Sequence, residues 1–73
     1  MDPRTLIIAP SDLSPREREV LTWAAVGKSA WEIGVLLGIS KRTVEQHVAT
    51  AARKLGANNR THAVAISVRN GII

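Results

Sequence analysis

The chain contains 73 residues, carries a formal net charge of +4 and has no cysteine. This length leaves room for one domain, and without cysteine there is no disulfide or thiolate metal site. The two histidines, His47 and His62, are too far apart for a helical ligand pair, so we expect no metal and no other cofactor. No apolar run approaches the roughly 20 residues that span a bilayer, and no secretion signal is visible. We therefore expect a cytoplasmic protein.

The positive charge is concentrated in the second half of the chain. Residues 1–40 carry four cations and five anions, whereas residues 41–73 carry six cations and one anion, Glu45. Such an asymmetry favours a polyanionic partner. Scattered surface lysines and arginines are also common in proteins without such a partner, so the charge alone leaves both explanations open.

Residues 1–12 are predicted to form an extended arm or linker. Pro3 and Pro10 flank the apolar stretch Leu6–Ile8, and proline is disfavoured inside helices. The folded domain is therefore expected to occupy residues 13–73.

Two capping signals open the first two helices of this domain. Ser14-Pro15-Arg16-Glu17 combines a serine N-cap, a proline at the first helical position and a glutamate that reaches back to the cap. Ser29-Ala30-Trp31-Glu32 repeats the spacing from serine to glutamate. Gly27 and Gly38 follow the two apolar stretches, where a left-handed glycine ends a helix. We expect one helix between each cap and its glycine.

The short second helix is expected to bury Ile33, Leu36 and Leu37 on one stripe. Ile39 then stands alone between Gly38 and the next cap, Ser40, and most simply fills the corner between two helices. This arrangement is a helix-turn-helix.

A third helix is predicted over about residues 41–55. Successive helical residues are about 100° apart, which places the apolar residues on one side. This expected core side comprises Val44, Val48, Ala51, Ala52 and Leu55. The opposite side is polar and basic and comprises Arg42, Gln46, Ala49, Thr50 and Arg53, with Glu45 at one edge and Thr43, His47 and Lys54 at the other.

The polar side of this helix has two explanations. Most charged helix faces are simply solvated surfaces. After a short capped helix and a tight turn, however, a face with arginine, glutamine and alanine suits the major groove of DNA, because fork-shaped donors reach base edges and alanine permits close approach. Gln46 would then bind adenine and Arg42 guanine.

A last helix is predicted from Asn58-Asn59 to Asn70, followed by Gly71. Its expected core side comprises Ala63, Val64 and Ser67; a second small or apolar side comprises Thr61, Ala65 and Val68, with Ile72 beyond the helix. A helix apolar on two sides needs two partners. We expect a weak homodimer through Val64, Ala65 and Val68, formed chiefly on palindromic DNA. The alternative is that residues 6–8 cover this surface.

Short motifs follow one another in order from Leu13 to the C-terminus. They include Arg16-Glu17-x-Glu19-Val20-Leu21, Gly27-Lys28-Ser29, Leu37-Gly38-Ile39-Ser40, Thr43-Val44-x-x-His47, Lys54-Leu55-Gly56 and Asn59-Arg60-Thr61. Together they resemble the LuxR-type (GerE-like) DNA-binding domain of bacterial transcription regulators. The resemblance implies an all-α domain of four helices, in which the third enters the major groove and the fourth mediates dimerisation.

The resemblance also implies roles for single residues. Base contacts are carried over to Glu45, Gln46 and Ala49, with Arg42 and Arg53 nearby, and phosphate contacts to Lys41, Thr43, His47, Lys54 and Arg60. His47 is equally compatible with a partly buried spacer. Trp31 and Gly34 depart from the family pattern, which commonly has a polar residue and an alanine there. Gly34 should cost the second helix up to about 1 kcal/mol.

Family members usually join this domain to an N-terminal receiver or ligand-binding domain. This chain contains neither, so we expect either an excised fragment or a free-standing regulator. The setting of Trp23 and the Asn59-Arg60-Thr61 motif point to the quorum-sensing branch that detects acyl-homoserine lactones.

An enzyme and a protein-binding module are two other classes of function for a chain of this kind. The sequence offers no nucleophile with an adjacent base, no paired carboxylates and no glycine-rich phosphate loop, so we expect no enzyme. The serious alternative is a protein-binding or antiactivator module that sequesters another regulator through its apolar fourth helix. DNA binding should depend steeply on salt, whereas an apolar contact should not.

Overall fold

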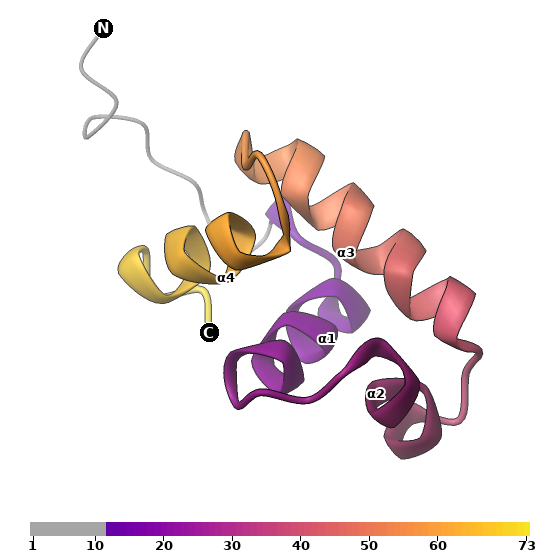
Figure 1. The fold of residues 1–73 in the computed structure, drawn as a ribbon. Coiled ribbons are helices and arrows are strands. Elements are labelled where there is room, and N and C mark those ends of the chain that lie inside the picture. The colour runs from indigo at the N-terminus through magenta and orange to yellow at the C-terminus, as the bar shows by residue number, and fades with distance from the viewer. Residues whose placement is uncertain (1–11) are drawn as a thin grey trace, which may run out of the picture.

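The computed structural model describes residues 12–73, which form four helices and no strand. The helices are α1 (Pro15–Ala25), α2 (Ala30–Leu37), α3 (Lys41–Leu55) and α4 (Arg60–Arg69) (Figure 1). The all-α prediction and the helix-turn-helix of α2 and α3 are confirmed. The predicted arm lies almost wholly outside the described residues, so its boundary at residue 12 stays a prediction.

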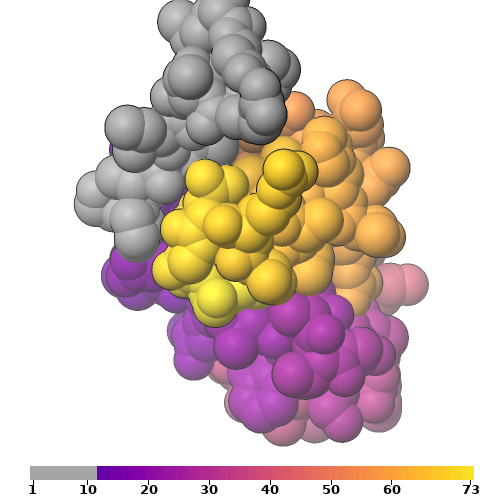
Figure 2. Space-filling model, turned by 90° about the vertical axis from the view of Figure 1, so that its left-hand side faces the viewer, coloured from indigo at the N-terminus to yellow at the C-terminus, as the bar shows by residue number. Residues whose placement is uncertain are grey.

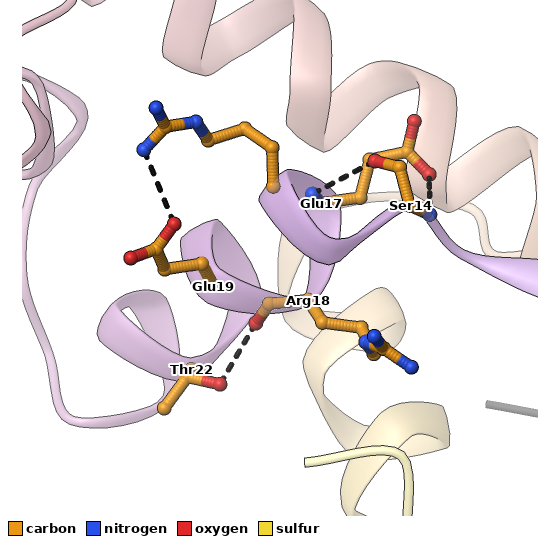
Figure 3. Close-up of polar contacts among 6 residues, drawn as sticks. Ser14, Glu17, Arg18, Glu19 and Thr22 are labelled. Carbon is orange, nitrogen blue, oxygen red and sulfur yellow. Dashed lines mark hydrogen bonds and ion pairs between the residues drawn. The ribbon is translucent and has the colours of Figure 1, made fainter. Parts of the chain in front are cut away.

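Both predicted capping boxes are present. The Ser14 side chain accepts a hydrogen bond from the Glu17 amide at 3.1 Å, and the Glu17 carboxylate accepts one from the Ser14 amide at 3.0 Å (Figure 3). Ser29 and Glu32 repeat the arrangement at 3.1 and 2.9 Å. These reciprocal bonds satisfy amides that a helix start leaves unpaired, which is why α1 and α2 begin where the sequence predicts.

The core consists of two apolar clusters. One joins α1, α3 and α4 and comprises Leu13, Leu21, Ala51, Leu55, Ala63 and Ile72; the other joins α1, α2 and α3 and comprises Val20, Ile33 and Val44. Helix α3 contributes to both clusters, and Figure 1 shows it running from the turn after α2 to the start of α4. The orientation of α3 is therefore fixed near both ends.

Some predicted core positions are more exposed than expected. Val48 and Ala52 are only partly buried, because both border a hollow beside α3. Leu36 is 50% exposed, so its predicted place in the core is wrong. Helix α2 buries Ile33 fully and Leu37 partly, and Leu36 lies about 100° around the helix from Leu37, where no other helix covers it.

The end of α4 also differs from the prediction. Gly71 has a φ of 67°, and the Ile72 amide donates to the Ser67 carbonyl at 2.8 Å. This Schellman motif turns the chain back, so Ile72 is only 7% exposed and joins the core instead of extending an outer apolar side. Ala63 and Ser67 are buried as predicted.

Gly34 has a packing role that its helix propensity does not indicate. It is buried in α2, and a Cβ atom there would lie 2.6 Å from the carbonyl oxygen of Ile39. The Ile39 amide also donates to the Gly34 carbonyl at 2.9 Å. The missing side chain therefore lets the turn before α3 lie directly against α2.

Candidate nucleic-acid interface

The outer face of α3 carries every residue predicted to contact bases. Arg42, Glu45, Gln46, Ala49 and Arg53 are all exposed. Within the part of the chain that the structure describes, none of these side chains forms a hydrogen bond or ion pair with another residue. The face is therefore available to an external partner rather than packed within the monomer.

An open hollow of about 840 Å³ lies along one side of this face. Helix α3 contributes Lys41, Glu45, Ala49 and Arg53 to it; the opposite wall comes from Asn58, Asn59 and Arg60 at the start of α4 and from Ala30 of α2. Arg42 and Gln46 are not part of its lining. The five predicted base-reading residues therefore form two rows, of which one borders the hollow and the other faces open solvent.

The N-terminal turn of α3 differs from those of α1 and α2. Those helices carry Glu17 and Glu32 in their first turns, where a carboxylate suits the positive end of the helix dipole. Helix α3 has no acidic residue there and begins with Lys41 and Arg42. Cations at this end cost roughly 0.3–1 kcal/mol each at low salt. An external anion would be attracted by the helix end and by both cations.

Two of the predicted phosphate-binding cations already have partners within the chain. The Lys54 ammonium donates to the Glu17 carboxylate at 2.9 Å. The Arg60 guanidinium donates to the carbonyl of Lys28, in the turn between α1 and α2. Sequence reasoning missed both contacts, because they join residues 37 and 32 positions apart.

The ion pair affects the titration of Glu17. Burial alone would raise the pKa of this carboxyl, but hydrogen bonds from Lys54 and from Ser14, together with the charge of Lys54, lower the pKa overall below its ordinary value of 4.5. Glu17 is therefore an ionised side chain held in the protein interior.

Thr43 and His47, predicted to contact phosphate, are partly buried on α3. The Thr43 amide donates to the side chain of the N-cap Ser40 at 3.0 Å, and the two hydroxyl oxygens lie 2.8 Å apart. Thr43 therefore helps to fix the start of α3 and keeps part of its side chain at the surface.

The predicted dimer surface lies on α4. Val68 is 58% exposed and Ala65 is also exposed, while Val64 packs partly against the core. Figure 2 shows the C-terminal half of α4 at the surface, beside α1 and the turn that follows it. Within residues 12–73 a small apolar surface thus remains uncovered on α4.

A second exposed apolar surface lies on α2. Trp31 is 65% exposed and Val35, one turn later, is 64% exposed. Most of the Trp31 side chain is therefore uncovered in the described part of the chain.

A membrane-spanning helix and a metal site are two alternatives to a nucleic-acid interface within residues 12–73. No helix there is both long and apolar enough to span a membrane. In the same range, no three histidine or acidic side chains gather as metal ligands would. The face of α3 is therefore the candidate site that the described residues present most clearly.

Known proteins share this fold and sequence. The family model for bacterial regulatory proteins of the LuxR family (GerE) matches residues 11–67. The solved structure of the transcription factor GerE superimposes with a TM-score of 0.80 at 33% identity, covering 84% of this chain and 91% of that one. The chain belongs to the LuxR family, and the matched residues 11–67 fall in the helix-turn-helix DNA-binding domain of a transcriptional regulator.

Three similar curated proteins are transcriptional regulators. The transcriptional activator protein BjaR1 of Bradyrhizobium diazoefficiens is 69% identical over 61 residues, and the quorum sensing-dependent regulator RpaR of Rhodopseudomonas palustris is 59% identical over the same length. The activator LuxR of Aliivibrio fischeri is 43% identical over 63 residues. These matches cover 84–86% of this chain but only 25% of each relative. The chain thus spans about a quarter of their length.

Proposed function

We propose that this domain binds double-stranded DNA in a sequence-specific manner, with α3 in the major groove. The observation that carries the proposal is the exposed, unpaired face of α3 on a helix-turn-helix of this family. In the proposed complex Arg42, Glu45, Gln46, Ala49 and Arg53 face base edges.

The phosphate contacts are proposed to flank this face. The candidates are Lys41 at the start of α3, Thr43 and His47 along it, and Arg60 beyond the hollow. Lys54 lies in the same region, but Glu17 already binds it. Arg60 is held by the Lys28 carbonyl through one guanidinium nitrogen, which leaves donors for a phosphate because arginine carries five.

Fluorescence titration against random and palindromic duplexes at two salt concentrations tests this function. DNA binding requires an affinity that falls steeply with salt, whereas salt-independent association with another protein would favour the antiactivator alternative. Gln46→Ala should weaken binding by about 1–3 kcal/mol at one base position only. Uniform weakening on every sequence would remove Gln46 from the base contacts.

We also propose that two copies associate on palindromic DNA through α4, around Val64, Ala65 and Val68. The exposed Val68 supports this, because it leaves apolar surface uncovered on α4. An arginine at this position would place a charge in the proposed apolar contact. Val68→Arg should abolish cooperative binding to a duplex with two half-sites but preserve binding to one half-site. Intact cooperativity in this variant would rule out the α4 interface.

The domain is further proposed to act within a longer cytoplasmic regulator that carries an N-terminal regulatory domain and responds to a quorum-sensing signal. The length of the relatives and the name of RpaR support this. In cells with the full-length regulator, transcription from a promoter bearing the bound palindrome should change with cell density. A response to density in cells that lack the regulator would contradict the proposal.

A further inference from the structure

The last turn of α3 holds two adjacent cations in different surroundings. Arg53 is exposed and lines the hollow. The ammonium of Lys54 lies 2.9 Å from a carboxylate oxygen of Glu17, on a different helix, and 39% of its side chain is exposed. These two neighbouring residues therefore have different surroundings: Arg53 borders the open hollow, and Lys54 contacts another helix of the protein.

Glu17 is an unusually fixed partner for a surface lysine. Only 7% of its side chain is exposed. The same oxygen that binds Lys54 also accepts the Ser14 amide at 3.0 Å. The capping box of α1, which Figure 3 shows, therefore fixes the position of this oxygen. The position of the carboxylate is thus fixed on α1 by the capping box, independently of Lys54.

Moving Lys54 to a phosphate would leave this buried carboxylate without its cation, and a buried unpaired charge is strongly disfavoured. The positive charge of Lys54 is also already offset by Glu17, which reduces its attraction to DNA. Keeping the pair intact on DNA avoids both costs.

We propose that Glu17 is a positioning residue for DNA binding: it holds Lys54, and with it the last turn of α3, in one orientation. In the complex with DNA, Lys54 stays paired with Glu17 and does not contact a phosphate. This inference rests on the proposed binding of DNA through α3. It changes the role that family resemblance implies for Lys54.

The pair acts on Arg53 and Ala49 through the rotation of the helix. Leu55, next to Lys54, and Ala51, one turn earlier, are buried against the core. Apolar contacts alone permit more rotation of a helix than apolar contacts combined with a directional ion pair. Loss of the pair therefore disturbs base contacts from the C-terminal half of α3, while phosphate contacts made by Lys41 at the other end persist.

The experiment uses four variants at Glu17 and Lys54, one reference variant at Lys41, and a palindromic duplex selected from a random pool by the unchanged 73-residue chain. Glu17→Gln removes the charge but keeps a side chain suited to the capping box, Lys54→Met removes the partner, and a third variant combines both. Lys54→Arg is the conservative control, because it retains the charge and the reach. Binding constants are measured across a salt series at a temperature where circular dichroism shows every variant folded.

Each single variant should weaken binding to the selected duplex by roughly threefold to thirtyfold, and the double variant should be no weaker than either single. The slope of log affinity against log salt should not change. Lys54→Arg should bind the selected duplex like the unchanged protein. All four variants at Glu17 and Lys54 should bind a random duplex with an affinity within about twofold of that of the unchanged protein. A residue that only stabilised the fold would shift the melting temperature without this selective loss.

Lys41→Met serves as the reference for a phosphate contact and should reduce the salt slope by about one. A similar reduction in Lys54→Met would show that Lys54 contacts phosphate and would overturn the inference. Additive losses, or unchanged affinity in both single variants, would overturn it as well. If even the unchanged protein showed no salt-dependent DNA binding, the proposed function itself would fail.

Discussion

The two ends of α3 are held by different kinds of interaction. Near the N-terminus, Val44 is fully buried against Ile33 and Val20, and the preceding turn lies against Gly34. Near the C-terminus, Leu55 is buried in the other cluster, and the Glu17–Lys54 ion pair lies beside it. Apolar packing anchors both ends of α3, but the Glu17–Lys54 ion pair lies only at the C-terminal end. Acid should therefore weaken the C-terminal anchor, whereas a small increase in side-chain volume at Gly34 should disturb the N-terminal end.

The largest effect is expected from removing an apolar anchor at either end. Ile33→Ala and Leu55→Ala each delete a buried side chain, which typically costs about 2–5 kcal/mol. A core of this size supplies only about 3–5 kcal/mol, so both variants should be largely unfolded by circular dichroism at 25 °C. Val35→Ala is the control, because Val35 is 64% exposed, and it should change stability by less than about 0.5 kcal/mol.

A smaller effect is expected from Gly34→Ala, at the N-terminal end. Alanine favours the helix by about 1 kcal/mol relative to glycine, but its Cβ would lie 2.6 Å from the Ile39 carbonyl oxygen, so the turn before α3 must move. We expect a net loss of about 1 kcal/mol in the free energy of unfolding, measured by urea denaturation. A gain in stability would show that the turn yields easily and that α3 is less firmly held there than we infer.

The smallest effect is expected at the C-terminal end and only in acid. The pKa of Glu17 in the folded protein is lowered, so its ionised form stabilises the fold above the ordinary value of 4.5, and this contribution is lost as pH falls through the lowered value. Tm should therefore decrease below about pH 4.5, and less steeply in Glu17→Gln.

Glu19→Gln provides the comparison for this acid effect. Glu19 pairs with Arg16 within α1 at 3.1 Å, with about half of its side chain exposed (Figure 3), and exposed pairs contribute little to stability. This variant should keep the full acid dependence. If the pH dependence of Tm became equally shallow in both variants, the acid effect would not arise from the Glu17–Lys54 ion pair at the C-terminal end of α3.

The predictions that succeeded were local ones. Capping boxes, left-handed glycines and helical periodicity operate over three to seven residues, so the four helices and the outer face of α3 could be found in the sequence.

The features that sequence reasoning missed depend on contacts between distant segments. Lys54 lies 37 residues after Glu17, and nothing local distinguishes it from a solvated lysine. Leu36 was misplaced because α2 is covered on only part of its surface, and Ile72 because a terminal turn brings it back to the core. Gly34 was judged by helix propensity, although a neighbouring backbone decides its role.

The Schellman turn at the end of α4 has a consequence for how the domain connects to other proteins. It places Ile72 in the same cluster as Leu13, so the first and last parts of the described chain meet at one corner of the core. Such proximity of ends is typical of modules that tolerate circular permutation and insertion. We therefore expect the domain to tolerate such rearrangement at this corner.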